Sequence, residues 1–148
     1  MSGPLLEYAS QVWSPYTAAE IAKVESVQRS FTKRLPGLNN LTYAQRLCVL
    51  GTESLELRRL WNDTVFVYKI LFGLVDMNFD EYFTLRADCA TRGHEHKLSV
   101  NYSRLNIRKH FFTERVVAVS NNLENGVIKF SSLTCFKNSL LQCFVQIC

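Results

Sequence analysis

Residues 17–35, TAAEIAKVESVQRSFTKRL, decide the fold class predicted for this chain. Thr17 and Glu20 stand in the S/T-x-x-E relation of a capping box, in which each side chain bonds the other residue's backbone N–H at a helix start. Apolar residues then recur at spacings of three and four, which is typical of a helix with one buried face. The residues of this predicted face are Ile21, Val24, Val27 or Gln28, Phe31 and Leu35. Pro36-Gly37 should end the helix, because proline cannot continue the hydrogen-bond ladder.

Two further helices are predicted after short connections. Thr42 and Gln45 form a second capping box, and Gly51 is typical of a helix C-terminus, so a short helix is expected between them. From Ser54 a broad apolar stripe runs towards Gly73 and predicts a longer, central helix. The stripe consists of Leu57, Leu60, Trp61, Val65, Tyr68, Leu71 and Phe72. The expected fold is therefore mainly α, with a small bundle of about three helices over residues 5–74.

The helical periodicity weakens after residue 74. Residues 75–108 are predicted to form a long irregular segment with one helical turn near residues 80–83, and a loop of that length is unusual in a compact domain. Helical spacing returns over residues 109–123 and again from Thr134. Residues 109–148 are therefore expected to form a C-terminal helical segment.

The composition limits the class of protein. Hydrophobic residues make up 47% of the 148 residues and charged residues 20%, which suffices for a core and excludes a disordered tail. The longest apolar stretch is interrupted by Lys69 and is too short to span a bilayer, so no membrane partner is expected. The five cysteines lack the spacing of a disulfide framework. We expect free thiols in an intracellular compartment, nuclear or cytoplasmic, with Cys48 and Cys135 buried as small apolar side chains.

Motifs of common catalytic sites are not found in the sequence: there is no P-loop, GxSxG, HExxH or Gly-rich dinucleotide loop. Cys89, His94 and His96 are metal-ligand types, but their spacing matches no common zinc site and no CxxC accompanies them. The favoured interpretation is a polar loop in which Arg92 and the histidines face solvent or a phosphate. No catalytic residue, metal or cofactor is therefore predicted.

Positive charge gathers in two stretches without acidic residues, although the net charge is only +4. These are residues 26–52 and 96–113. Their candidate nucleic-acid-binding residues are Arg29, Lys33, Arg34 and Arg46 in the first, and Lys97, Arg104, Arg108 and Lys109 in the second. In the second stretch Tyr102 and Phe111 lie among the cations, a pattern that suits phosphates and stacked bases. For each stretch alone a solvated helix face is the favoured explanation, and in the first stretch Lys33 and Arg34 would be stabilised near a helix C-terminus. The two stretches together leave this explanation and nucleic-acid binding equally open.

Two strings near the N-terminus carry a resemblance to a known family: EYASQVWSP at residues 7–15 and FTKRLPGL at residues 31–38. Weaker matches continue in short strings, namely LTY at 41–43, SLE at 54–56, YKILFGL at 68–74, TRGH at 91–94, RVV at 115–117 and FK at 136–137. Over nearly its whole length the chain resembles non-LTR (LINE-like) retrotransposon reverse transcriptases, in the thumb-like and C-terminal region downstream of the polymerase palm.

The resemblance implies contact with nucleic acid rather than chemistry. The family's metal-binding aspartates, in an F/Y-A-D-D string, belong upstream, and no such string occurs here. Without carboxylates to hold two divalent cations, nucleotide transfer is not expected. The resemblance thus implies a catalytically incomplete reverse transcriptase fragment, not an enzyme, whose partners are an RNA or DNA backbone and the upstream polymerase domain.

Two other classes remain open beside this one. A helical interaction or self-association module would leave Trp13, Phe31 or Leu35 partly bare, since exposed apolar patches tend to mark interfaces. A non-functional relic of an element is the third class. It is favoured by a departure from the family after Val117, where Trp-Asn and Leu-Pro are common and this chain has Ser120-Asn121 and Leu123-Glu124.

Overall fold

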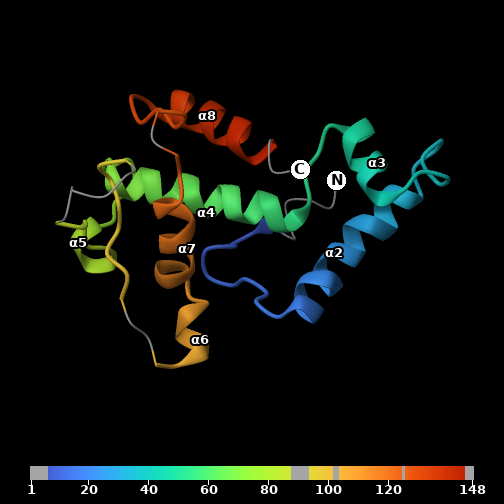
Figure 1. Ribbon diagram of the computed structural model, residues 1–148. Helices are drawn as coiled ribbons and strands as arrows, with labels where there is room; N and C mark the ends of the chain where they lie inside the picture. Colours follow the sequence, from blue (N-terminus) through green and yellow to red (C-terminus); the bar gives the residue numbers. More distant parts are fainter. Residues whose placement is uncertain (1–6, 88–93, 102–103, 125, 146–148) are drawn as a thin grey trace. The chain divides into compact units, whose positions relative to one another are not determined.

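The computed structural model describes residues 7–87, 94–101, 104–124 and 126–145, and these residues are mainly α-helical (Figure 1). The helices are α2 (Ala18–Lys33), α3 (Tyr43–Leu50), α4 (Leu55–Leu71), α5 (Phe79–Tyr82), α6 (Asn106–Lys109), α7 (Phe112–Asn121) and α8 (Leu133–Val145). Within these ranges strand-like pairing is limited to one isolated antiparallel bridge between Leu85 and Leu98. The predicted fold class, mainly α, is confirmed.

The predicted starts of the first two helices are confirmed in atomic detail. Thr17 Oγ1 accepts from the Glu20 backbone N–H at 3.2 Å, and the Glu20 carboxylate accepts from the Thr17 N–H at 3.3 Å. Thr42 and Gln45 make the same reciprocal pair at the start of α3. Gly51 ends α3 with a φ of 58°, a left-handed conformation that glycine adopts without the steric cost of a Cβ.

The chain divides into two compact units, Met1–Leu60 and Trp61–Cys148, here called unit 1 and unit 2. The division falls within α4, whereas the sequence predicted segments of 5–74, 75–108 and 109–148. A continuous helix carries the same periodicity on both sides of such a division, so the apolar pattern of α4 gives no sign of it.

Polar residues of α2 line the interior of unit 1, and the predicted apolar face is corrected here. The buried residues of α2 are Glu25, Gln28 and Thr32, while Val27 and Phe31 are 45% and 41% exposed. The helix is therefore turned by about one residue from the orientation that its apolar spacing predicts. Spacing cannot reveal this, because the buried residues follow the same three- and four-residue steps.

Specific hydrogen bonds explain why these polar side chains lie inside. The Glu25 carboxylate accepts from the Tyr43 hydroxyl, and from the Leu55 backbone N–H at 3.0 Å. Gln28 Nε2 donates to the Glu53 carbonyl at 3.0 Å. Because the first N–H groups of a helix have no partner within the helix, Glu25 caps α4 from a distant part of the sequence.

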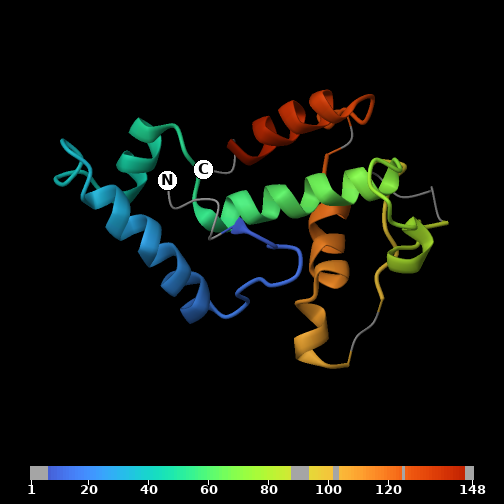
Figure 2. The same ribbon diagram turned by 180° about the vertical axis from the view of Figure 1, so that it is seen from behind.

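Unit 2 has a conventional apolar core. Its central cluster consists of Val67, Ile70, Phe83, Leu98, Val116 and Val117. Beside it Phe136 and Leu140 of α8 are almost fully buried, and the Phe136 ring stacks on Tyr68 with 4.4 Å between ring centroids. Figures 1 and 2 show α8 running alongside the unit 2 part of α4, with α7 crossing it. The two predicted C-terminal helices are thus confirmed.

The segment predicted to be irregular, residues 75–108, is partly ordered by contacts with α7. It contains α5 at the predicted helical turn, and it supplies Phe83 and Leu98 to the core. The Asn121 side chain fixes Leu98 through both backbone groups: Oδ1 accepts from the Leu98 N–H at 2.7 Å and Nδ2 donates to its carbonyl at 2.8 Å. Hydrogen bonds of this kind between a side chain and a distant backbone produce no periodic sequence pattern, so they could not be predicted.

None of the helices in the described part of the chain has the length and apolar character needed to cross a membrane.

Candidate nucleic-acid interface

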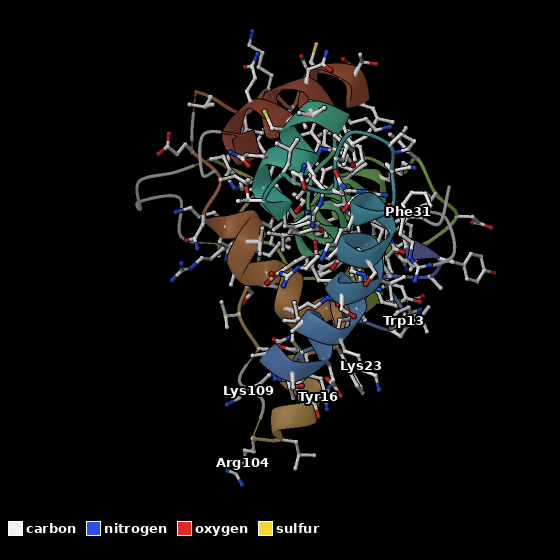
Figure 3. All side chains as sticks on the ribbon, turned by 90° about the vertical axis from the view of Figure 1, so that its right-hand side faces the viewer. Trp13, Tyr16, Lys23, Phe31, Arg104 and Lys109 are labelled. Atoms are coloured by element: carbon white, nitrogen blue, oxygen red, sulfur yellow. The ribbon has the colours of Figure 1, made fainter. Side chains whose placement is uncertain are left out.

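The side of α2 that faces away from the polar interior carries a basic surface. At 3.6 residues per turn, Lys23, Val27, Phe31 and Arg34 follow one another along one side of this helix. Arg29 and Lys33 lie one turn apart on the other flank of the exposed surface, opposite Phe31, and all of these side chains are exposed. We call Lys23, Arg29, Lys33 and Arg34, together with Val27 and Phe31, the α2 basic face. Figure 3 shows Lys23 and Phe31 projecting from α2.

Acidic groups contribute little to this surface. Helix α2 contains Glu20 and Glu25, of which Glu25 is buried. Glu20 is exposed at the start of the helix, where hydrogen bonds from Thr17 and Tyr16 hold its carboxylate and lower its pKa. The middle and end of the exposed surface therefore carry cations without an acidic neighbour on the same helix.

Lys23 was missed by the sequence prediction. It precedes the acid-free stretch, because Glu25 lies between it and Arg29 in the sequence. Once Glu25 is known to point inside, Lys23 joins the same exposed side as Arg34, three helical turns away. The signal that could have identified it was the spacing of eleven residues to Arg34.

Arg29 is held in place by an aromatic ring. Its guanidinium carbon lies 5.0 Å from the centroid of the Tyr43 ring. The Tyr43 hydroxyl donates to Glu25, and burial together with this carboxylate raises the pKa of Tyr43 well above its usual value. Tyr43 thus stays neutral and keeps its bond to Glu25, so its ring is a fixed platform for Arg29. A cation that is already positioned loses less conformational freedom when it meets a phosphate.

Arg46 does not belong to the exposed surface, which differs from the prediction. It is only 5% exposed, and its Nε donates to Thr32 Oγ1 at 3.2 Å. Its Nη1 donates to the Leu41 carbonyl, and its guanidinium lies 5.6 Å from the Tyr43 ring centroid. A buried guanidinium needs such partners for its several N–H donors. Arg46 thus helps to hold α3 to α2 and is not available to a phosphate.

The second predicted cluster is only partly brought together. Arg104, Arg108 and Lys109 are exposed on and next to the short helix α6, where Figure 3 shows Arg104 and Lys109 extending outward. Lys97 lies elsewhere in unit 2, next to the Leu85–Leu98 bridge, with its carbonyl accepting from a backbone N–H. Of the predicted aromatic neighbours, Phe111 is 58% exposed, and Tyr102 lies outside the described residues.

His94 is buried, which corrects the prediction that it faces solvent. It is 5% exposed, and its Nε2 donates to the Ser120 carbonyl at 2.8 Å, since a carbonyl can only accept. Burial lowers the pKa of His94, and its ring packs 5.1 Å from that of Phe130. His96 packs against the same phenyl ring at 4.8 Å. Both histidines therefore have structural contacts in unit 2.

The other candidate metal-site residues give no cluster in the described structure. Cys89 and Arg92 lie outside the described residues. Among the residues that are described, no three His, Cys, Asp or Glu side chains gather where they could hold a metal ion. Cys48 and Cys135 are both exposed, contrary to the prediction that they are buried.

Apolar side chains are bare around α2, and among them are Trp13 and Phe31, two of the three side chains that an interaction module would leave partly bare. Trp13 is 43% exposed and Phe31 is 41% exposed, whereas Leu35 is half-buried. The Arg59 guanidinium lies 4.3 Å from the Trp13 ring centroid, so this ring already has a cation against it. Phe31 and Val27 are therefore the exposed apolar side chains that share one side of α2 with Lys23 and Arg34.

Comparisons of the chain with models of protein families, with curated proteins and with solved structures found no match. The resemblance to non-LTR reverse transcriptases thus rests on the sequence strings quoted above.

Proposed function

We propose that this chain is a catalytically incomplete fragment of the non-LTR reverse transcriptase type that binds the backbone of RNA or DNA through the α2 basic face. The observation that supports this proposal is the orientation of α2. Its acidic Glu25 points into the polar interior of unit 1, while Lys23, Arg29, Lys33 and Arg34 remain on the exposed side. The exposed Glu20 lies one turn before Lys23, whereas Arg29, Lys33 and Arg34 have no exposed acidic residue beside them on this helix. Exposed cations of this kind attract phosphates and release their counterions.

Binding of this kind would position a nucleic acid without reading its sequence. Lysine and arginine contacts to phosphates fix register and orientation, whereas sequence is read from base edges. The cluster of Arg104, Arg108 and Lys109 offers further cations in unit 2. Little preference among sequences is therefore expected.

A fluorescence anisotropy titration against a labelled RNA stem-loop tests the proposal. If about four phosphates are contacted, affinity should fall roughly 50- to 150-fold between about 50 mM and 200 mM salt. Saturable binding with this dependence would support the proposal. No binding at the lower salt concentration would contradict it.

Self-association is a second candidate function, because Trp13, Val27 and Phe31 are each more than 40% exposed. Elution volume in size-exclusion chromatography at low and high salt separates the two functions. Association through apolar surface should survive high salt, whereas a complex with co-purified nucleic acid should dissociate.

A further inference from the structure

An exposed phenyl ring lies at one edge of the α2 basic face. Phe31 is 41% exposed, next to Val27 at 45% along the same side of the helix. The neighbouring positions that point inside are taken by Gln28 and Thr32, which have hydrogen-bond partners there. The interior of unit 1 is therefore filled without Phe31, and the ring is left on the surface.

Two cations lie on the same side of the helix as this ring. Arg34 lies one turn after Phe31 and Lys23 lies about two turns before it on the same side, whereas Arg29 and Lys33 are each two residues from Phe31 and lie on the opposite flank of the helix. The stretch from Lys23 to Arg34 spans about 16 Å at 1.5 Å per residue. A purely apolar partner would have to desolvate these charges, which is costly. A polyanion that also carries flat apolar groups matches both features.

We infer that the α2 basic face binds unpaired nucleic acid, with a base stacked on Phe31 and the flanking phosphates on the neighbouring cations. This inference rests on the proposed function and narrows its ligand class. In a duplex both faces of each internal base are covered by neighbouring bases, so Phe31 has nothing to stack on. Single strands expose base faces, and surfaces that combine cations with aromatic rings bind them with little sequence preference.

The test compares three fluorescein-labelled ligands of equal length: an oligothymidylate, an abasic oligodeoxyribose phosphate and a DNA duplex. The full chain should bind the oligothymidylate at least about 5-fold more tightly than the abasic strand, since both carry the same phosphates per strand. It should also prefer the oligothymidylate to the duplex.

Variants of Phe31 test whether its ring causes the preference for the oligothymidylate over the abasic strand. Phe31→Ala should weaken oligothymidylate binding by about 5- to 150-fold, the range for one stacked base, and leave abasic binding unchanged. Phe31→Trp should keep the preference because it keeps an aromatic face. Tyr82→Ala is the matched control: it removes an aromatic ring of similar exposure, 39%, from α5 of unit 2, and its loss should change no affinity.

The outcomes separate this inference from the proposed function. Salt-dependent binding that is equal for the three ligands, or unchanged in Phe31→Ala, overturns the inference and leaves backbone binding intact. No binding of any ligand overturns the proposed function itself. If Phe31→Ala abolishes a concentration-dependent dimer without changing oligothymidylate affinity, the surface belongs to a second copy of the chain and the inference is wrong.

Discussion

Replacing Glu25 by alanine should destabilise unit 1 strongly, because this one side chain joins three parts of the unit. Its carboxylate is 9% exposed and accepts from the Leu55 N–H at 3.0 Å and from the Tyr43 hydroxyl. A hydrogen bond to a charged group contributes about 1.5–3 kcal/mol to the free energy of unfolding. The loss of both bonds should therefore cost about 3–5 kcal/mol, with some recovery where water enters. Glu25→Gln keeps an acceptor oxygen and should cost about half as much.

Urea unfolding followed by tryptophan fluorescence measures this loss. In a Trp61→Phe background the remaining Trp13 reports on unit 1. Glu56→Ala is the matched control, since it removes an exposed carboxylate from the first turn of α4 and should cost less than about 1 kcal/mol. If Glu25→Ala costs no more than this control, the polar interior assigned to unit 1 is refuted.

Further predictions concern unit 2 and the thiols. Because burial lowers the pKa of His94 below its ordinary 6.5, its imidazole takes up a proton on unfolding. Stability should therefore decrease as the pH falls below 6.5. The urea concentration at the unfolding midpoint, measured against pH, should fall less steeply in His94→Gln than in the original chain. An equal slope in the variant would exclude His94 as the cause. Leu140→Ala should cost about 2–5 kcal/mol in urea unfolding, because Leu140 is 0% exposed; a loss below about 1 kcal/mol would mean that α8 is not packed as described. Iodoacetamide should modify Cys135 faster than Cys143, as peptide mapping can show, because serine hydroxyls lower the pKa of the exposed Cys135 thiol while burial raises that of Cys143. Equal rates would contradict these assignments.

The helix boundaries were predictable because their signals are local. The Thr17–Glu20 and Thr42–Gln45 pairs each need only the backbone within four residues, and Gly51 ends α3 through its own conformation. Nothing distant competes with such bonds. The mainly α class followed directly from these helices.

The orientation of α2 was not predictable because it depends on partners far away in the sequence. Glu25 is buried by its bonds to Tyr43 and Leu55, which follow it by 18 and 30 residues. Hydrophobic spacing predicts that Val27 and Phe31 are buried, because it takes no account of which polar side chains find hydrogen-bond partners in the interior. For the same reason the buried Arg46, whose Nε and Nη1 donate hydrogen bonds within unit 1, was placed in the predicted binding surface.

The type of a single residue was also insufficient to predict whether that residue is buried. His94 in a polar stretch looked solvent-facing, but its bond to the Ser120 carbonyl and its contact with Phe130 place it inside. Cys48 was expected to be buried because free cysteines usually are, yet it is exposed on α3. Of the candidate interface, the sequence therefore predicted the exposed cations Arg29, Lys33 and Arg34, but it missed Lys23 and the Tyr43 ring against which Arg29 lies.

The most direct test of the central claim is the salt dependence of RNA affinity in two variants of equal charge. One is Lys33→Ala with Arg34→Ala on the α2 basic face. The other is Arg86→Ala with Lys129→Ala, which removes two exposed cations from unit 2. The first pair should reduce the slope of log affinity against log salt by up to about 1.8, since each lost phosphate contact contributes about 0.9, and the second should leave it nearly unchanged. An unchanged slope in the first pair would show that Lys33 and Arg34 contact no phosphates and would contradict the account.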